Sequence, residues 1–141
     1  MRGSYKELVV PAQIEKLQEV LSFLEQALGE VDCPLKKQMQ IAVAAEEVFV
    51  NIASYAYAPG TGIATVFIEI VDDLPVATIA FSDSGVPFDP LKKADPNVTL
   101  PAEEREIGGL DIFMAKKTMD EVRYEYKDGQ NRLTLVKKLY F

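Results

Sequence analysis

Histidine is absent from this sequence of 141 residues, and cysteine occurs only once. Without histidine the chain cannot hold a Ser-His-Asp or Cys-His triad, a histidine-ligated zinc site or a phosphorylated histidine of its own. The single cysteine, Cys33, excludes a disulfide within the chain. Its place in the turn VDCPL favours a small buried side chain over a nucleophile.

Positive charge is scarce as well. The chain has 15 Lys and Arg residues against 22 Asp and Glu residues, which gives a net charge of -7. This balance argues against direct nucleic-acid binding, because contacts from basic residues to phosphates supply most of the affinity there. It suits a basic or mixed-charge protein partner, or a nucleotide held by backbone N–H groups.

Long hydrophobic runs are also missing. No apolar stretch reaches the roughly 20 residues of a membrane span, and the start of the chain, MRGSYKEL, lacks the apolar core of a signal peptide. We therefore expect a cytoplasmic protein with no membrane partner. The length, with no repeat or linker, predicts one domain over residues 1–141.

The periodicity of apolar residues predicts strands and helices in a simple order. We expect helices over 14–28, 38–57 and 110–119, strands over 5–10, 63–71, 76–81, 121–126 and 132–140, a loop over 82–90 and a flexible segment over 92–106. The last two strands would form a hairpin across Asp128-Gly129-Gln130-Asn131. This order predicts an α+β fold, a two-layer sandwich with helices on one face of a largely antiparallel sheet.

The predicted helix over 38–57, QMQIAVAAEEVFVNIASYAY, is apolar on most of its circumference. Glu47 and Asn51 nevertheless lie four residues apart on one face, so their side chains are neighbours. In apolar surroundings these groups cost free energy unless something pairs with them, and no basic residue occurs between Lys37 and Lys92. The partner could be a bound ligand. Alternatively, Glu46, Glu47 and Asn51 could form the solvated face of an amphipathic helix.

Two further motifs share a chemical logic with this helix. Asp83, in the motif D-x-G, can accept a hydrogen bond from the amino group of adenine, and Gly85 would let the base approach the backbone. The backbone N–H groups of Gly108, Gly109 and Leu110, at a predicted helix N-terminus, would meet phosphates.

The polar residues of the central helix complete this set. The amide oxygen of Asn51 can join the shell of a Mg²⁺ ion that otherwise keeps waters and phosphate oxygens. Glu47, one turn earlier, could orient or deprotonate an attacking hydroxyl. Each motif is weak alone, but together they predict a site for ATP and Mg²⁺.

Four stretches of the sequence resemble the GHKL (Bergerat-fold) ATPases, and within them the small bacterial anti-sigma factors that are serine-protein kinases. EEVFVNIASYAY resembles the N box, FSDSGVPFDP the first glycine box, IGGLDIFMAKKTMDEVRYEY the second glycine box, and NRLTLVKK the closing strand. The resemblance covers nearly the whole chain. The first glycine box and GGL-x-IF are its most diagnostic parts.

The resemblance implies roles for the motif residues. Glu47 would be the general base, Asn51 the Mg²⁺ ligand and Asp83 the adenine reader, and Thr134 matches the residue that supports this aspartate. Residues 92–106 would form the ATP lid, in which Arg105 is the first candidate for contacting the γ-phosphate. Where the family often has another glycine after GGL, this chain has Asp111, which would repel phosphates unless it points away or helps to hold Mg²⁺.

The implied function is an ATP-dependent serine-protein kinase acting on a small anti-anti-sigma protein of the STAS type. By the same resemblance the protein would hold a sigma factor inactive and form a homodimer. A different class stays open, a protein-sequestering module with a vestigial nucleotide pocket. The absence of histidine excludes an autophosphorylating histidine kinase, but not a catalytic fragment that acts on another chain.

Overall fold

Five antiparallel strands form a single sheet in the computed structural model, which describes residues 3–57, 60–71, 74–87, 89–90 and 112–140. The strands lie in the order β1-β2-β3-β5-β4. Their bounds are β1 Gly3–Pro11, β2 Ile63–Val71, β3 Val76–Asp83, β4 Glu121–Lys127 and β5 Gln130–Lys138. The predicted hairpins β2–β3 and β4–β5 are both present, and β3 pairs with β5 to join them.

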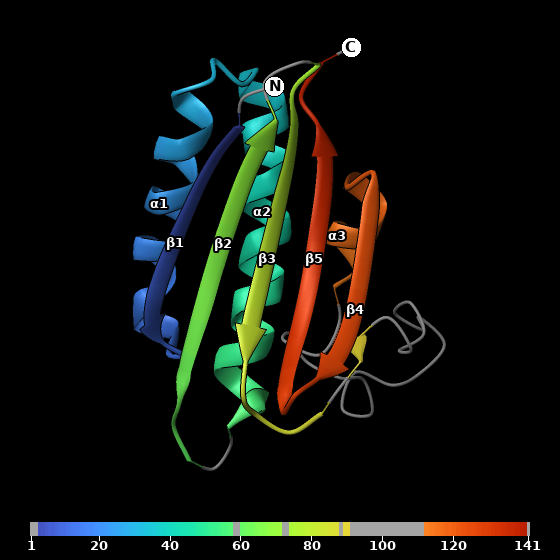
Figure 1. The fold of residues 1–141 in the computed structure, drawn as a ribbon. Coiled ribbons are helices and arrows are strands. Elements are labelled where there is room, and N and C mark those ends of the chain that lie inside the picture. Colours follow the sequence, from blue (N-terminus) through green and yellow to red (C-terminus); the bar gives the residue numbers. More distant parts are fainter. Residues whose placement is uncertain (1–2, 58–59, 72–73, 88, 91–111, 141) are drawn as a thin grey trace, which may run out of the picture.

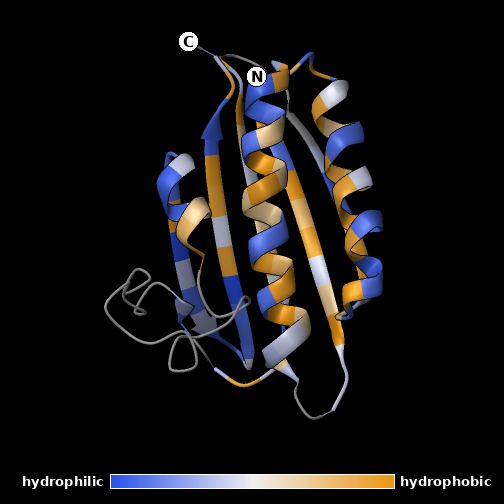
Figure 2. Ribbon diagram, turned by 180° about the vertical axis from the view of Figure 1, so that it is seen from behind, coloured by the Kyte–Doolittle hydropathy of each residue, from blue (hydrophilic) through white to orange (hydrophobic). Residues whose placement is uncertain are grey.

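The helices lie together on one face of this sheet (Figures 1 and 2). They are the 3₁₀ turn η1 Ile14–Lys16, α1 Leu17–Gly29, α2 Leu35–Asn51, the π-helical turn η2 Ile52–Ala56 and the short helix α3 Phe113–Thr118. In Figure 2, α2 lies between α1 and α3, and it contacts both. The predicted two-layer α+β sandwich is therefore confirmed.

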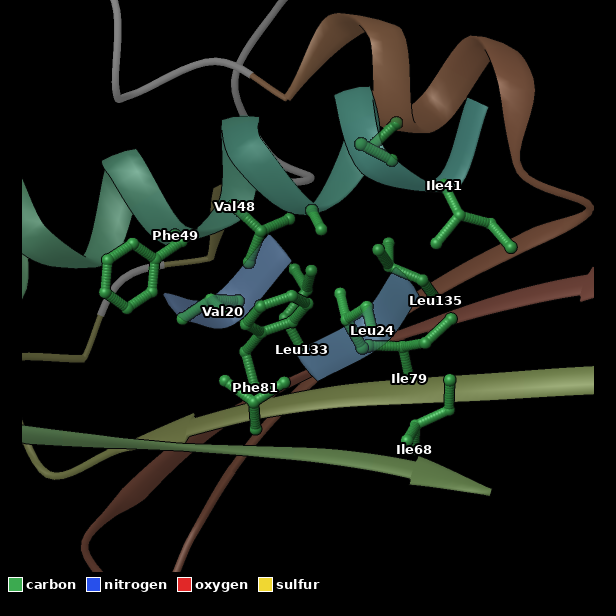
Figure 3. Packing of buried hydrophobic residues seen from close by; sticks show 14 of the residues in the cluster. Val20, Leu24, Ile41, Val48, Phe49, Ile68, Ile79, Phe81, Leu133 and Leu135 are labelled. Carbon is green, nitrogen blue, oxygen red and sulfur yellow. The ribbon is translucent and has the colours of Figure 1, made fainter. Parts of the chain in front are cut away.

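The core lies between the helices and the sheet. Alternate residues of β2 point to the helices, which buries Ala64, Val66, Ile68 and Ile70. Figure 3 shows side chains of α1, α2 and the strands meeting in this layer, among them Val20, Leu24, Ile41, Val48, Phe49, Ile79, Phe81 and Leu135. Cys33 is buried, as expected of a small apolar side chain, and burial raises the pKa of its thiol.

The central helix differs from its prediction at both ends. It begins three residues earlier than expected, at Leu35, directly after Pro34. After Asn51 the chain continues as the π-helical turn η2 and not as an α-helix. Such turns are rare and occur frequently at functional sites, because they displace the side chains next to them. Asn51 is the last α-helical residue before this change.

Three other boundaries also differ, and they matter for the site. β3 extends to Asp83, which the sequence placed in a loop. The β4–β5 turn has only two residues, Asp128 and Gly129, with φ angles of 55° and 77° that are typical of a type I′ turn. Asn131 therefore lies inside β5 and not in the turn. Ile112, expected inside a helix, lies just before α3.

The other face of the sheet carries no helix among the described residues (Figure 1). Three apolar side chains on it are largely exposed: Tyr5 (59%), Val9 (55%) and Ile63 (58%). Phe67 lies between them and the polar part of this face, 6.0 Å from the ring of Tyr5 and 4.8 Å from the guanidinium of Arg132. We call Tyr5, Val9, Ile63 and Phe67 the open-face patch. Among the described residues, no helix is both long and apolar enough to cross a membrane.

Candidate functional site

A cavity of about 150 Å³ lies where α2 and η2 meet the ends of β3 and β5. Most of its lining is apolar, and the lining residues that carry polar side-chain groups are Asn51, Tyr55, Asp83, Tyr124 and Asn131. The apolar lining residues include Val48, Ile52, Ala56, Phe81, Val86, Ile112 and Leu133. An apolar cavity with a few convergent polar groups suits a flat heterocyclic ligand.

Asp83 is the last residue of β3 and is only 6% exposed. Its Oδ1 accepts two hydrogen bonds, from the backbone N–H of Gly85 at 2.9 Å and from Nδ2 of Asn131 at 3.0 Å. A buried carboxylate costs free energy unless it is bonded in this way. The two donors therefore hold the Asp83 side chain in one orientation at the cavity wall.

Gly85 is required at its position by close packing. A Cβ atom at Gly85 would lie 2.1 Å from the carbonyl oxygen of Ala56, at the end of η2. The next residue, Val86, donates its N–H to that same oxygen at 2.9 Å. The absence of a side chain thus lets the loop after β3 seat directly on η2. We had expected Gly85 to leave room for the base; the observed contact is between two parts of the protein.

The support of Asp83 comes from Asn131, which the sequence analysis missed. In β5 it is directly opposite Asp83, whereas Thr134 is opposite Ala80. Side chains alternate along β5, so Thr134 points to the open face and Asn131 to the cavity. The role expected of Thr134 is corrected accordingly. The dipeptide Asp128-Gly129, a strong signal for a two-residue turn, could have placed Asn131 in the strand.

Asn51 lines the same cavity from the end of α2 and is 8% exposed. Its Nδ2 is buried and has no hydrogen-bond partner among the described residues. Leaving such a donor unpaired costs about 1–3 kcal/mol. The alternative of a solvated face is thus wrong for Asn51, although it holds for the exposed Glu46. An orphaned donor in a cavity wall indicates a place where a ligand can bind.

Glu47 is half-buried and reaches α3. Its Oε2 accepts the backbone N–H of Met114 at 3.0 Å, and its Oε1 accepts that of Ala115 at 2.7 Å. These N–H groups belong to the first turn of α3, where they have no partner within the helix. At the other end of α3, the buried Lys137 donates its Nζ to the carbonyl of Thr118 at 2.5 Å. Two side chains of opposite charge therefore fix α3 at its two termini.

The family comparison covers nearly all of these elements. The model of the histidine kinase-like ATPase domain matches residues 10–137, which include α2, the end of β3, α3 and almost all of β5. The chain belongs to this family. The resemblance to the GHKL ATPases is thereby confirmed.

Two individual proteins are similar to this chain. A serine/threonine-protein kinase, BtrW of Bordetella bronchiseptica, is 25% identical over 95 residues, which are 67% of this chain and 66% of that kinase. A crystal structure of the RsbU and RsbW domains of a Mycobacterium tuberculosis protein matches 96% of this chain and 32% of its own, with a TM-score of 0.65 and 17% identity. At that identity the structural likeness shows the fold alone.

The polar groups of the ATPase domain fit a Mg²⁺ ion only together with phosphates. Among the described residues there is no cluster of three or more carboxylate, thiol or imidazole groups that could hold a metal alone. Asn51 offers one amide, whose oxygen and nitrogen exchange places when the side chain turns by 180°. One amide oxygen with waters and phosphate oxygens is a usual magnesium shell, since Mg²⁺ takes few protein ligands.

Several predicted site residues lie outside the described part of the chain. These are Arg105, Gly108, Gly109, Leu110 and Asp111. The roles expected of them in contacting phosphates stay predictions. Within the described residues, the structure brings Asn51, Asp83 and Asn131 to one cavity and places Glu47 one helical turn before Asn51.

Proposed function

We propose that this chain is an ATP-binding domain with Mg²⁺-dependent serine-protein kinase activity toward a STAS-type anti-anti-sigma protein, and that it restrains a sigma factor. The observation that carries the proposal is the cavity, in which a fixed carboxylate, Asp83, and an orphaned amide, Asn51, converge from distant parts of the chain. The family match and the kinase named among the relatives support it.

In the proposed site each side chain has one task. Asp83 accepts a hydrogen bond from the adenine amino group, and the apolar walls exclude water from the base. Asn51 holds Mg²⁺ through its amide oxygen, and the ion would neutralise charge on the phosphates. Gly108, Gly109, Leu110 and Arg105 are proposed to contact the phosphates.

The chemical step would be an in-line transfer assisted by Glu47. The serine oxygen of the partner attacks the γ-phosphorus, the bond to the β-phosphate oxygen breaks, and Glu47 takes the serine proton. The products are ADP and phosphoserine. Each carboxylate oxygen of Glu47 accepts one N–H of α3. The cap on α3 thus orients the base.

The test is transfer of labelled phosphate from ATP to the partner protein by wild type and by Glu47→Gln. We expect a rate at least ~100-fold lower for the variant, because a positioned base contributes roughly 10²–10⁴-fold. Glu46→Gln is the matched control, since Glu46 is adjacent on α2 and exposed. Transfer by Glu47→Gln at the wild-type rate would remove Glu47 as the base.

A second candidate is a non-catalytic module that sequesters its partner. The capping role of Glu47 favours it, because that carboxylate already has a structural task in joining α2 to α3. The same experiment separates the two candidates. Partner binding without any transfer by the wild type would support sequestration.

The proposal also includes a cytoplasmic homodimer made of single-domain subunits. The open-face patch supports self-association, because it exposes large apolar side chains on a sheet face without covering helices in the described chain. Measuring the molecular mass by light scattering across a dilution series tests this part. Replacing Val9 and Ile63 by Lys should shift the mass toward the monomer.

A further inference from the structure

The polar side chain behind Asp83 belongs to Asn131, and its amide is fully hydrogen-bonded. Asn131, 7% exposed, donates its Nδ2 to Oδ1 of Asp83 at 3.0 Å and to the carbonyl of Val86 at 2.9 Å. Its Oδ1 accepts the hydroxyl hydrogen of Tyr124. The carbonyl of Gly85 also lies 3.4 Å from this Nδ2. These partners together satisfy the amide, and three of them, Asp83, Val86 and Tyr124, line the cavity.

This arrangement permits only one orientation of the Asn131 amide. Turning it by 180° would place its oxygen against a carboxylate and a carbonyl, both of which only accept, and its NH₂ against the hydroxyl of Tyr124. The Tyr124 hydroxyl can donate or accept, so the acceptor-only groups of Asp83 and Val86 select the observed orientation, and the hydroxyl adds a bond that holds the amide in it. Asn131 is therefore held between Tyr124 on β4 and Asp83 on β3.

This arrangement has a consequence for what the cavity can bind. Oδ1 of Asp83 receives two donors from the protein, whereas no donor of the described residues bonds Oδ2. With its rotation fixed, Asp83 offers the ligand one carboxylate oxygen that can only accept. A ligand group facing this oxygen must donate; a carbonyl there would face it with like partial charge.

We propose that Asn131, held in place by Tyr124, is the positioning residue that makes this site select a purine with a 6-amino group over one with a 6-oxo group. This inference rests on the proposed binding of ATP. It adds the residues that set base specificity, which Asp83 alone does not provide. A carboxylate free to rotate could move an oxygen to accept from a donor at another position of the base. The preference for the 6-amino purine would then fall.

The experiment compares the affinity of the full chain for ATP and for inosine triphosphate by titration calorimetry with Mg²⁺. The two nucleotides differ only at the 6-position and the adjoining N1 of the base. We expect the wild type to prefer ATP by about tenfold or more, since a hydrogen bond to a charged group is worth roughly 1.5–3 kcal/mol. Asn131→Ala should bring the ratio of the two affinities close to one.

Tyr124→Phe is the milder variant, because it removes only the hydroxyl that bonds the Asn131 amide oxygen. It should lower the ratio several-fold and leave the fold intact. Tyr126→Phe is the matched control, because Tyr126 lies two residues further along β4 and is 46% exposed outside the cavity lining. It should keep the wild-type ratio.

The ratio distinguishes positioning from mere structural support. If Asn131 had a purely structural role, its loss would weaken the binding of both nucleotides equally. An unchanged ratio of the two affinities in Asn131→Ala and Tyr124→Phe would therefore overturn the inference, although the proposed binding of ATP would remain. Failure of the wild type to bind either nucleotide would instead overturn the proposed function, and this inference with it.

Discussion

Asp83 and Asn51 line the same cavity, but the protein treats their side chains in opposite ways. Asp83 receives two hydrogen bonds from its neighbours, and the residue behind it is locked in turn. Asn51 has a buried Nδ2 that no described residue accepts. Asp83 thus has hydrogen-bond partners in the absence of a ligand, whereas the Nδ2 of Asn51 has none among the described residues.

The difference indicates two ways of preparing for a ligand. A preorganised carboxylate loses little conformational freedom on binding, so it favours affinity and specificity. An unpaired buried amide destabilises the empty protein, and a ligand that pairs with it recovers that free energy. Binding at Asn51 should therefore be strongly linked to stability, whereas the Asp83 network should stabilise the fold with or without ligand.

The largest effect that we expect comes from Gly85, where the loop after Asp83 packs against η2. Gly85→Ala would place a Cβ atom 2.1 Å from the carbonyl oxygen of Ala56, and backbone there cannot move aside cheaply. We expect a loss of about 3 kcal/mol in the free energy of unfolding, near the upper end for overpacking. Urea denaturation measures it. A loss below about 1 kcal/mol would show that this part of the cavity wall is pliable, and the contrast with Asn51 would weaken.

Asn131→Leu should be nearly as damaging. It removes one donor from Oδ1 of Asp83 and leaves the carbonyl of Val86 and the hydroxyl of Tyr124 without their partner. Unpaired buried polar groups of this kind cost about 1–3 kcal/mol each when water cannot reach them. We expect a total loss of about 2–3 kcal/mol by thermal and urea unfolding. An unchanged free energy of unfolding would mean that water replaces the Asn131 amide.

The response to ligand should differ between wild type and Asn51→Ala. At an ATP–Mg²⁺ concentration of 100 times the dissociation constant, binding adds about 2.7 kcal/mol of stability to the wild type. The variant should gain much less at the same concentration, because it has lost the metal ligand and the orphaned amide. Thermal shift with and without Mg²⁺ measures the difference. Equal shifts for both proteins would eliminate Asn51 as a contact of metal or phosphate.

The smallest effect that we expect is on the free energy of unfolding of Asn51→Leu, which should stay the same or increase. Asn51→Leu exchanges an unpaired buried amide for an apolar side chain of similar size, which is neutral or stabilising by about 1 kcal/mol. The free energy of unfolding without ligand therefore distinguishes it from Asn131→Leu, although both replace a buried asparagine by leucine. A loss above about 1 kcal/mol would indicate that Asn51 is paired in solution.

The sequence allowed the fold to be predicted because its layers follow simple periods. β2 alternates buried Ala64, Val66, Ile68 and Ile70 with less buried residues, and α2 carries apolar stripes on its buried faces. Asp83 and Asn51 were identifiable because polar residues in apolar stretches need an explanation. These sequence patterns are local, so they can be recognised without knowledge of the tertiary structure.

The parts that were missed depend on contacts between distant segments. Asn131 reaches Asp83 only because a two-residue turn sets the register of β5, and we had assumed a four-residue turn. The partners of Glu47 lie 67 and 68 residues further along the chain. The π-helical turn η2 has no sequence period of its own. Register, long-range capping and helix irregularity were therefore not predictable from local pattern.

Tyr57, at the end of η2, has a consequence for how the protein opens locally. Its hydroxyl donates to the carbonyl of Ile63 at 2.6 Å and accepts the backbone N–H of Ser84 at 2.7 Å. One hydroxyl thus ties the entry of β2 to the loop that follows Asp83. In hydrogen-exchange terms, the exposed Ser84 amide should be protected and should exchange together with the end of η2 as one cooperative unit. Tyr57→Phe would remove the protection of the Ser84 amide, while the bond from the Val86 N–H to the carbonyl of Ala56 would still hold the loop on η2.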